Sequence, residues 1–134
     1  MDELKMQLNQ LWSGIIKNIN FDLLNGELSL EIKVIENGMI SNFDIIFQEV
    51  SAHYFIRNNG ESRLTTFLVE QGDYLELSSI DYFSNGIGEI TIHSKGNEWV
   101  NQYFSSANFV LEIWSSILFI EAKKMIINGI TYNV

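Results

Sequence analysis

Five Asn-Gly dipeptides punctuate the chain, at residues 25–26, 37–38, 59–60, 85–86 and 128–129. Asparagine and glycine both tolerate the positive φ angles that a type I′ turn requires, so this dipeptide between apolar runs is a strong local signal for a β-hairpin. Proline, which disfavours a central strand, is absent from the 134 residues. The turns and the missing proline together predict an antiparallel meander.

The runs between these turns alternate as half-buried strands do. In residues 27–35, leucine, isoleucine or valine occupies every second position, and most of the positions between them are charged or polar. Such alternation predicts one buried face and one solvated face. The same reading predicts strands over residues 16–23, 27–35, 41–50, 52–57, 62–70, 73–83, 88–94 and 130–134.

The most apolar segment, residues 107–127, is the one around which we expect the rest of the chain to pack. Its two apolar runs are rich in β-branched and aromatic residues and are separated only by Ser115 and Ser116. Both faces of the first run are largely apolar, which predicts a central strand covered on both sides. A long buried helix is the alternative, because a continuous apolar run does not define its own period.

Two segments depart from the strand pattern. Residues 2–12 carry leucine or tryptophan at positions 4, 8, 11 and 12, which form one stripe of a helix. A helix this short does not fold alone in water, so we expect its stripe to lie on the sheet. For residues 97–108 we predict either a short helix with an aromatic face or a loop lid with the same aromatic side chains.

Together these elements predict an α+β fold that is mainly β. We expect an antiparallel meander of about seven to nine strands that forms a half-barrel or a two-layer sandwich, with the N-terminal helix packed on it. The length fits a single domain, residues 1–134, and 46% hydrophobic with 19% charged residues is a globular composition. Cysteine is absent, which excludes disulfides and thiolate chemistry.

The formal net charge of −9 is large for this length. Nucleic acid and anionic membranes are bound through basic patches, so neither is an expected partner. The N-terminus lacks the pattern of a secretory signal, and no apolar run is long enough to span a bilayer, so we expect a cytoplasmic protein. The acidity either keeps the protein soluble or forms a face suited to a basic partner.

Signals for catalysis are thin. His53 and His93 are the two histidines, and neither has a second ligand at a metal-binding spacing. The glycine-rich and nucleophile motifs of common enzyme families are absent. Carboxylate pairs between residues 73 and 89 have the residue types of a glycosidase acid and base, but solvated strand faces explain them better. We therefore expect no enzyme, no metal and no cofactor.

Two carboxylates, Glu112 and Glu121, lie inside the most apolar segment. A buried carboxylate needs a partner or a shifted pKa. Lys123 would share the strand face of Glu121, two residues along the chain, and is the candidate partner. We expect structural roles for both carboxylates, such as an ion pair or a position at the rim of the sheet.

Charge is segregated along the chain. No basic residue occurs between Arg63 and Lys95, where acids and aromatic residues are interleaved. Tyrosine and tryptophan anchor many protein interfaces, and carboxylates steer a basic partner toward them. Core packing is the alternative for each aromatic residue. The predicted partner-binding residues are Glu70, Asp73, Tyr74, Glu76, Asp81, Tyr82, Glu89, Trp99 and Tyr103.

Three segments carry a family resemblance: INFDLLNGELSLEI, DYLELSSIDYFSNGIGEI and FVLEIWSSILFIEAKKMIINGITY. Their pattern of strands and turns resembles that of the YxiG-like proteins, small acidic proteins of Gram-positive bacteria associated with loci for wall-associated polymorphic toxins. The resemblance implies an immunity role, in which a cytoplasmic protein binds and blocks a cognate toxin domain. It supplies no functional residues.

The sequence thus predicts a non-enzymatic protein-binding module that inhibits a basic toxin domain through its acidic and aromatic residues. A small-ligand-binding protein with a barrel-like cavity is one alternative. Another is a homodimeric protein without catalytic activity, since the exposed edges of a proline-free sheet allow pairing between copies. Either a monomer or a homodimer is compatible with the sequence.

Overall fold

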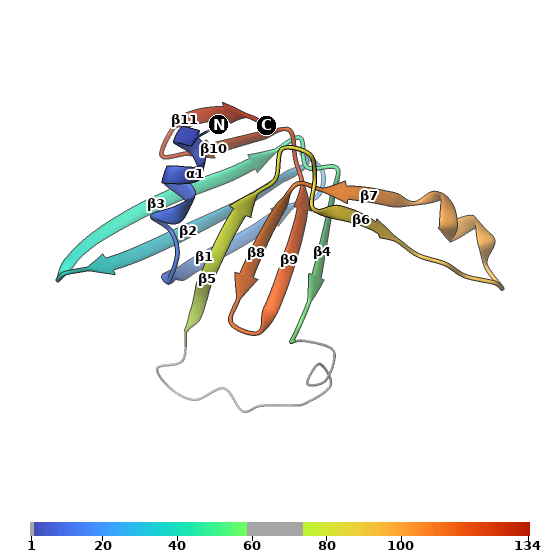
Figure 1. Cartoon of the computed structure of the whole chain (residues 1–134), viewed down its shortest axis with the longest axis horizontal. Coiled ribbons are helices and arrows are strands. Elements are labelled where there is room, and N and C mark those ends of the chain that lie inside the picture. The colour runs from blue at the N-terminus through green and yellow to red at the C-terminus, as the bar shows by residue number, and fades with distance from the viewer. Residues whose placement is uncertain (1, 59–73) are drawn as a thin grey trace.

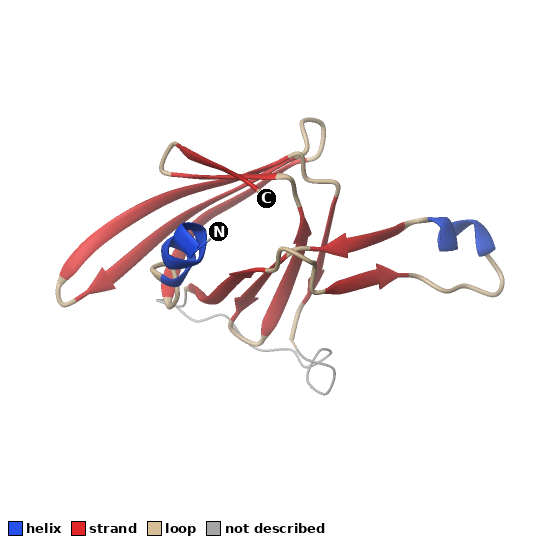
Figure 2. Cartoon of the chain, turned by 45° about the horizontal axis from the view of Figure 1, so that its top comes forward, coloured by secondary structure: helices blue, strands red, loops and turns tan. Residues whose placement is uncertain are grey.

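The computed structural model describes residues 2–58 and 74–134, which form one curved antiparallel sheet with a short helix on its concave side (Figure 1, Figure 2). The sheet has nine strands in the order β11-β10-β3-β2-β1-β5-β8-β9-β4, and β6 pairs with β7 in a separate ribbon. The elements are α1 Asp2–Asn9, β1 Gly14–Asp22, β2 Glu27–Glu36, β3 Met39–Gln48, β4 Ala52–Ile56, β5 Leu75–Tyr82, β6 Gly88–Thr91, the 3-10 helix η1 Glu98–Gln102, β7 Phe104–Ala107, β8 Phe109–Ile113, β9 Ser116–Glu121, β10 Lys124–Ile127 and β11 Ile130–Asn133.

The predicted fold class is confirmed: the protein is mainly antiparallel β, with an N-terminal helix packed on the sheet. Within the described residues the sheet ends at β11 on one side and β4 on the other, and it does not close into a barrel. The predicted strand over residues 62–70 and the Asn-Gly pair at 59–60 lie outside the described residues.

The Asn-Gly pairs form different kinds of turn. Residues 37–38 and 128–129 form tight hairpin turns in which both residues have positive φ, as a type I′ turn requires. In residues 25–26 only the glycine has positive φ, and the pair closes a longer loop between β1 and β2. Residues 85–86 lie between β5 and β6, which are not paired with each other. The local signal therefore marks each of these turns but not which strands pair.

The sheet bends at a corner. Two stretches of the chain pass through this corner, and each consists of two consecutive strands. β3 continues into β4 after residues 49–51, and β9 continues into β10 after residues 122–123. On one side of the corner β3 pairs with β10, and on the other side β4 pairs with β9. Sheets turn corners where extra residues interrupt the ladder in this way.

Asn108 completes the ladder at this corner. Its side-chain nitrogen donates to the carbonyl of Ala122 at 2.8 Å, and its side-chain oxygen accepts from the Ala122 backbone nitrogen at 3.1 Å. Ala122 is 2% exposed, so its backbone groups have little access to water. The amide of Asn108 thus takes the place of a neighbouring strand residue for Ala122.

The helix fills the concave side of the sheet next to β5. Leu4, Leu8 and Leu11 of the predicted stripe are buried in the common hydrophobic core, whereas Trp12, its fourth member, is 43% exposed. The helix is shorter than predicted: it ends at Asn9, and the chain then turns toward β1. In that turn the Trp12 indole donates to the Ile80 carbonyl at 3.1 Å, where β1 no longer pairs with β5.

The segment 107–127 contains strands and no helix. It forms β8, β9 and β10, and β8 lies between β5 and β9. Its inner face, represented by Phe109 and Leu111, is fully buried. The outer face is covered only in part, because Val110 is buried while Glu112 and Trp114 are exposed. The prediction of a central strand is therefore right, and its full coverage on both sides is not.

Gly14 joins the helix to the sheet where there is no space for a side chain. A Cβ at this position would lie 2.5 Å from Cγ2 of Ile32 and 2.9 Å from the carbonyl oxygen of Leu11. We expect Gly14→Ala to lower the free energy of unfolding by about 1–3 kcal/mol, because a close-packed core resists added volume. Gly96→Ala is the control, since a Cβ there meets nothing within 4 Å. Urea denaturation that finds the two variants equally stable would show that this junction can adjust.

Asn108 provides a second test of the fold. Asn108→Ala removes both hydrogen bonds to Ala122 and leaves buried backbone groups without partners. We expect a loss of about 1–3 kcal/mol in the free energy of unfolding, measured by chemical denaturation. Asn20→Ala, at an exposed position of β1, should change stability little. Equal denaturation midpoints for Asn108→Ala and the wild type would contradict the proposed role of Asn108 at the corner.

Candidate functional site

Among residues 2–58 and 74–134, the most exposed aromatic side chains belong to an arm of the molecule. The arm projects from the sheet (Figure 1). The arm consists of β6, η1 and β7, and its two strands pair from Gly88 with Ala107 to Thr91 with Phe104. Trp99 and Tyr103 are each 64% exposed and Phe104 is 68% exposed. Large apolar side chains that cluster on the surface of a protein often mark a binding site.

Local hydrogen bonds stabilise the tip of the arm. The Ser94 backbone nitrogen donates to the side-chain oxygen of Asn101 at 2.9 Å, and the Asn97 backbone nitrogen donates to Ser94 Oγ at 3.0 Å. The rings of Trp99 and Tyr103 meet edge to face, with centroids 6.4 Å apart. Asn97 does not cap η1 with its side chain. The predicted helix over this segment is thus a 3-10 helix of five residues, and the strand β7 follows it.

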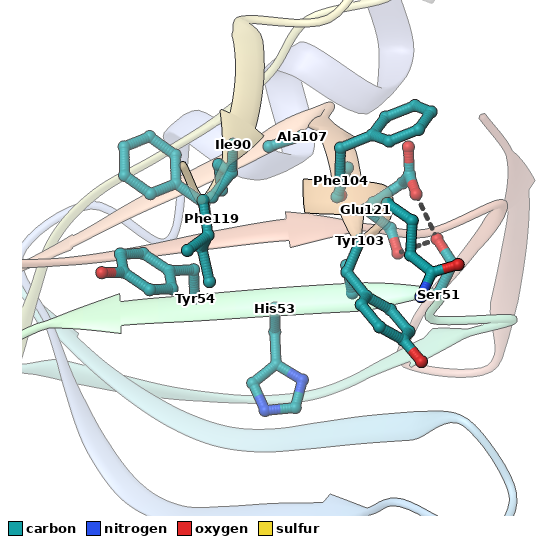
Figure 3. Close-up of a pocket in the computed structure, with 13 residues that line it drawn as sticks. Ser51, His53, Tyr54, Ile90, Tyr103, Phe104, Ala107, Phe119 and Glu121 are labelled. Carbon is teal, nitrogen blue, oxygen red and sulfur yellow. Dashed lines mark hydrogen bonds between the residues drawn. The ribbon is translucent and has the colours of Figure 1, made fainter. Parts of the chain in front are cut away.

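A first groove, with a volume of ≈ 400 Å³, runs between the arm and the outer face of β4 and β9 (Figure 3). We call it the arm groove. It is lined by Ser51, Ala52, His53, Tyr54, Ile90, Ile92, Gln102, Tyr103, Phe104, Ser105, Ala107, Phe119 and Glu121. Most of these side chains are apolar or aromatic, which suits an apolar group of a partner.

Glu121 ties the base of the arm to the corner of the sheet (Figure 3). One carboxylate oxygen accepts from the hydroxyl of Ser51, and the other accepts from the Ser106 backbone nitrogen at 3.1 Å. The predicted partner Lys123 is exposed. Glu121 does have a structural role, as predicted, but it acts through these hydrogen bonds; among the described residues it forms no ion pair with Lys123.

A second groove, with a volume of ≈ 350 Å³, lies on the other side of β4. We call it the turn groove, because the loop between β1 and β2 forms much of it. It is lined by Phe21, Asp22, Leu23, Gly26, Glu27, Leu28, Val50, Ser51, Ala52 and His53. His53 packs its ring on Phe21, with centroids 4.8 Å apart, and lines both grooves.

The two grooves have an acidic character. Of the described residues that line them, none is lysine or arginine, whereas Asp22, Glu27 and Glu121 are carboxylates. Two hydrogen bonds from Asn25 hold the pKa of Asp22 below its ordinary value of 3.8. The bond from the Asn25 side chain has the larger effect, and the bond from its backbone nitrogen adds to it. Asp22 therefore keeps its negative charge at neutral pH.

A sequence model of the family described as YxiG-like protein matches residues 4–132. The chain belongs to the YxiG-like family. It is also similar to the uncharacterized protein YxiG of Bacillus subtilis strain 168, with 29% identity over 108 residues that cover 81% of this chain and 74% of the relative. The family match extends over the sheet, the arm and both grooves.

Three of the predicted partner-binding residues of this YxiG-like protein lie on the arm. Glu89 is exposed on β6, and Trp99 and Tyr103 are exposed around η1. Tyr103 also lines the arm groove. The arm thus carries both the acidic and the aromatic parts of the predicted face.

The other predicted residues lie elsewhere. Tyr74 precedes β5 and packs beside Trp114, with ring centroids 5.8 Å apart, and Glu76 is near it at the start of β5. Asp81 and Tyr82 are at the opposite end of β5, and Tyr82 is buried against Phe109. The structure therefore divides the described part of the predicted face into three groups. Glu70 and Asp73 lie outside the described residues.

Sequence reasoning missed several residues of the two grooves. Tyr54, Phe119 and Phe104 line the arm groove, and Phe21 lines the turn groove. Tyr54, Phe119 and Phe21 occur within ordinary strand patterns, where an aromatic residue predicts core packing equally well. Phe104 falls in the segment 97–108, which was predicted as an aromatic helix or loop. The acid count was an available signal for Asp22 and Glu27, but these lie far in sequence from the charge gap that drew attention.

Among residues 2–58 and 74–134, no three His, Asp or Glu side chains are placed to hold a metal ion together. Glu112 is exposed and accepts a hydrogen bond from the hydroxyl of Ser79 at 2.9 Å. Within the same ranges, no helix has the length and hydropathy needed to cross a membrane.

Asp81 has a pKa raised above its ordinary value of 3.8, chiefly because it is partly buried and also because it faces Glu112, while Lys5 opposes the shift. A raised carboxylate pKa in the folded state makes ionisation unfavourable for folding. This cost is present at neutral pH and disappears as the pH falls through the raised pKa and below 3.8.

We therefore expect Asp81→Asn to be more stable than the wild type near neutral pH, by an amount that shrinks toward acid pH. Thermal unfolding of both proteins over this pH range measures the difference. Glu36→Gln, which removes an exposed carboxylate at the end of β2, is the control for net charge. A constant difference at all pH values would rule out ionisation of Asp81 as its cause.

Proposed function

We propose that this protein is a non-enzymatic protein-binding module, an immunity-type inhibitor that binds a basic toxin domain through the arm and the grooves at its base. One observation carries the proposal: Trp99, Tyr103 and Phe104 are about two-thirds exposed beside a groove that no described lysine or arginine lines. Such side chains are costly to leave in water unless a partner covers them.

The aromatic residues provide the affinity in this proposal. Tryptophan and tyrosine bury much apolar area with few rotatable bonds, and they are enriched among the residues that dominate binding energy. A two-stranded ribbon is only marginally stable by itself. The hydrogen bonds at its tip and the contact of Glu121 at its base therefore help to present these side chains in a fixed arrangement.

The charge provides the rate and the choice of partner. A net charge of −9 attracts a basic domain over a distance and repels acidic proteins. A toxin that acts on nucleic acid has a basic groove for phosphates, and an acidic protein of this kind competes for that groove. Glu89 supplies negative charge on the arm, and Asp22 and Glu27 supply it at the turn groove on the other side of β4.

A small apolar ligand is the second candidate, because the arm groove has the volume of a typical ligand site. The concave interior of the sheet does not favour a carrier, since the core side chains of α1, β2, β8 and β10 fill it as one cluster. A ligand would therefore bind on the surface, where the aromatic side chains of the arm remain partly exposed.

The proposal is tested with the product of the gene next to the one for this chain, assayed for binding as a purified toxin domain candidate. We expect Trp99→Ala and Tyr103→Ala each to weaken binding by at least about tenfold in calorimetry, as truncation of interface anchors does. Glu89→Lys should slow association in stopped-flow measurements, and the wild-type association rate should fall as salt is added.

Two further variants provide a control and a test of how far the binding face extends. Met39→Ala removes an exposed apolar side chain at the distal end of the β2–β3 hairpin, away from the arm, and should leave affinity unchanged. Tyr74→Ala tests whether the group near Trp114 belongs to the same face. Undiminished affinity in both arm variants, with their circular dichroism unaltered, would remove the arm from the interface and the proposal with it.

A further inference from the structure

Strand β4 is an edge of the nine-stranded sheet. It pairs with β9 along one side, and no described residue pairs with its other side. Proteins usually protect such edges with lysine, proline or a bulge within the strand. The sequence of β4, AHYFI, has none of these, and Tyr54 and Phe55 are about half exposed. This edge therefore has the features of a strand that accepts another strand.

The grooves lie on opposite faces of this edge. Tyr54 pairs across the ladder with Phe119, and both line the arm groove. His53 pairs with the core residue Ile120, points away from Phe119 and packs on Phe21 of the turn groove (Figure 3). Successive side chains of a strand point to opposite faces, so a strand added at this edge would direct alternate residues toward the two grooves.

The chemistry of the two grooves differs. The arm groove is walled by aromatic and aliphatic side chains such as Ile90, Phe104 and Phe119. The turn groove carries the carboxylates of Asp22 and Glu27. An added strand would fit best if residues with large apolar side chains alternate with lysine or arginine.

We propose that the edge of β4 that pairs with none of the described residues binds an extended segment of a basic partner protein as an additional antiparallel or parallel strand, with apolar side chains in the arm groove and basic side chains at the turn groove. The basic sign of the partner rests on the proposed function. The mode of binding rests on the edge and its two grooves.

Other occupants fit less well. A helix presents its side chains on one face at a time, so a single helix cannot fill grooves on opposite sides of β4. A second copy of this chain would bring the same carboxylates against themselves, and both copies have a net charge of −9. An extended basic segment satisfies the backbone of the edge and the charge of the turn groove together.

Selection from a random dodecapeptide library, displayed on phage and sequenced after panning on the full chain, tests this proposal. We expect enriched peptides in which apolar or aromatic residues alternate with lysine or arginine. In nitrogen-proton NMR spectra, the selected peptide should shift the amide signals of residues 51–54 and of the groove residues. No enrichment over the starting library, helical spacing of the enriched residues, or shifts confined to other strands would overturn the proposal.

The backbone contribution is tested without changing the protein. The selected peptide is made again with N-methyl groups on alternate amides, in both registers. We expect one register to bind at least about tenfold more weakly, because N-methylation removes the donors that pair with an edge strand. Equal affinity for both registers and for the unmodified peptide would exclude strand addition.

The charge contribution is tested in the protein. The double variant Asp22→Asn, Glu27→Gln should bind the selected peptide at least about fivefold more weakly and lose the preference for basic residues in a new selection. Glu31→Gln, Glu36→Gln removes two exposed carboxylates from the same strand, β2, outside the groove, and should bind like the wild type. Similar losses in both double variants would show that net charge alone attracts the peptide.

The two proposals fail separately. If the arm variants abolish toxin binding while peptide selection yields nothing, strand addition is wrong and the inhibitor function stands. If peptides bind at β4 but the toxin domain does not bind the protein, the edge site stands and the proposed function is wrong.

Discussion

The corner between β3–β4 and β9–β10 is the constraint on which the rest of the structure depends. Two strands pass through it side by side, and each carries extra residues that interrupt the regular ladder. The backbone groups freed by these residues find partners within the corner. The backbone of Ala122 pairs with the side-chain amide of Asn108, and the Ser51 backbone nitrogen donates to the Glu121 carbonyl at 3.0 Å. An ion pair between Lys124 and Glu49, at 3.5 Å, spans the same turn. Without these partners a bend of this kind would leave polar groups buried and unpaired.

The candidate site is a consequence of this corner. Ser51 and Glu121, which belong to it, also hold the base of the arm through the Ser106 backbone nitrogen. The bend brings β4 next to the β1–β2 turn, so that His53 meets Phe21 and a groove forms on each side of the edge. The residues that stabilise the corner therefore also shape the candidate site, and the arm with its exposed aromatic side chains is attached to a hydrogen-bonded part of the sheet.

Much of the fold was predictable, because the signals involved are local. Turn residues that tolerate positive φ and side chains that alternate along a strand identified most of the hairpins and the inner face of β8. The site was predictable only in part. Glu89, Trp99 and Tyr103 were grouped because they lie in one region of the sequence, and the structure places all three on the arm. The residues at the two ends of β5 were grouped with them, but the structure separates these ends, since a strand of eight residues extends over about 26 Å.

By itself the sequence determined that this chain forms antiparallel hairpins, covers them with an amphipathic helix and carries an excess of negative charge, since each of these follows from residues that are neighbours along the chain. Only the tertiary structure decided which strands pair, where the sheet bends, and which aromatic residues reach the surface. Tyr82 and Tyr103 illustrate the difference: both follow similar mixtures of apolar and polar residues, yet one packs against Phe109 and the other remains 64% exposed on the arm. The physical reason is that burial depends on what lies opposite a side chain, and that neighbour comes from a distant part of the sequence.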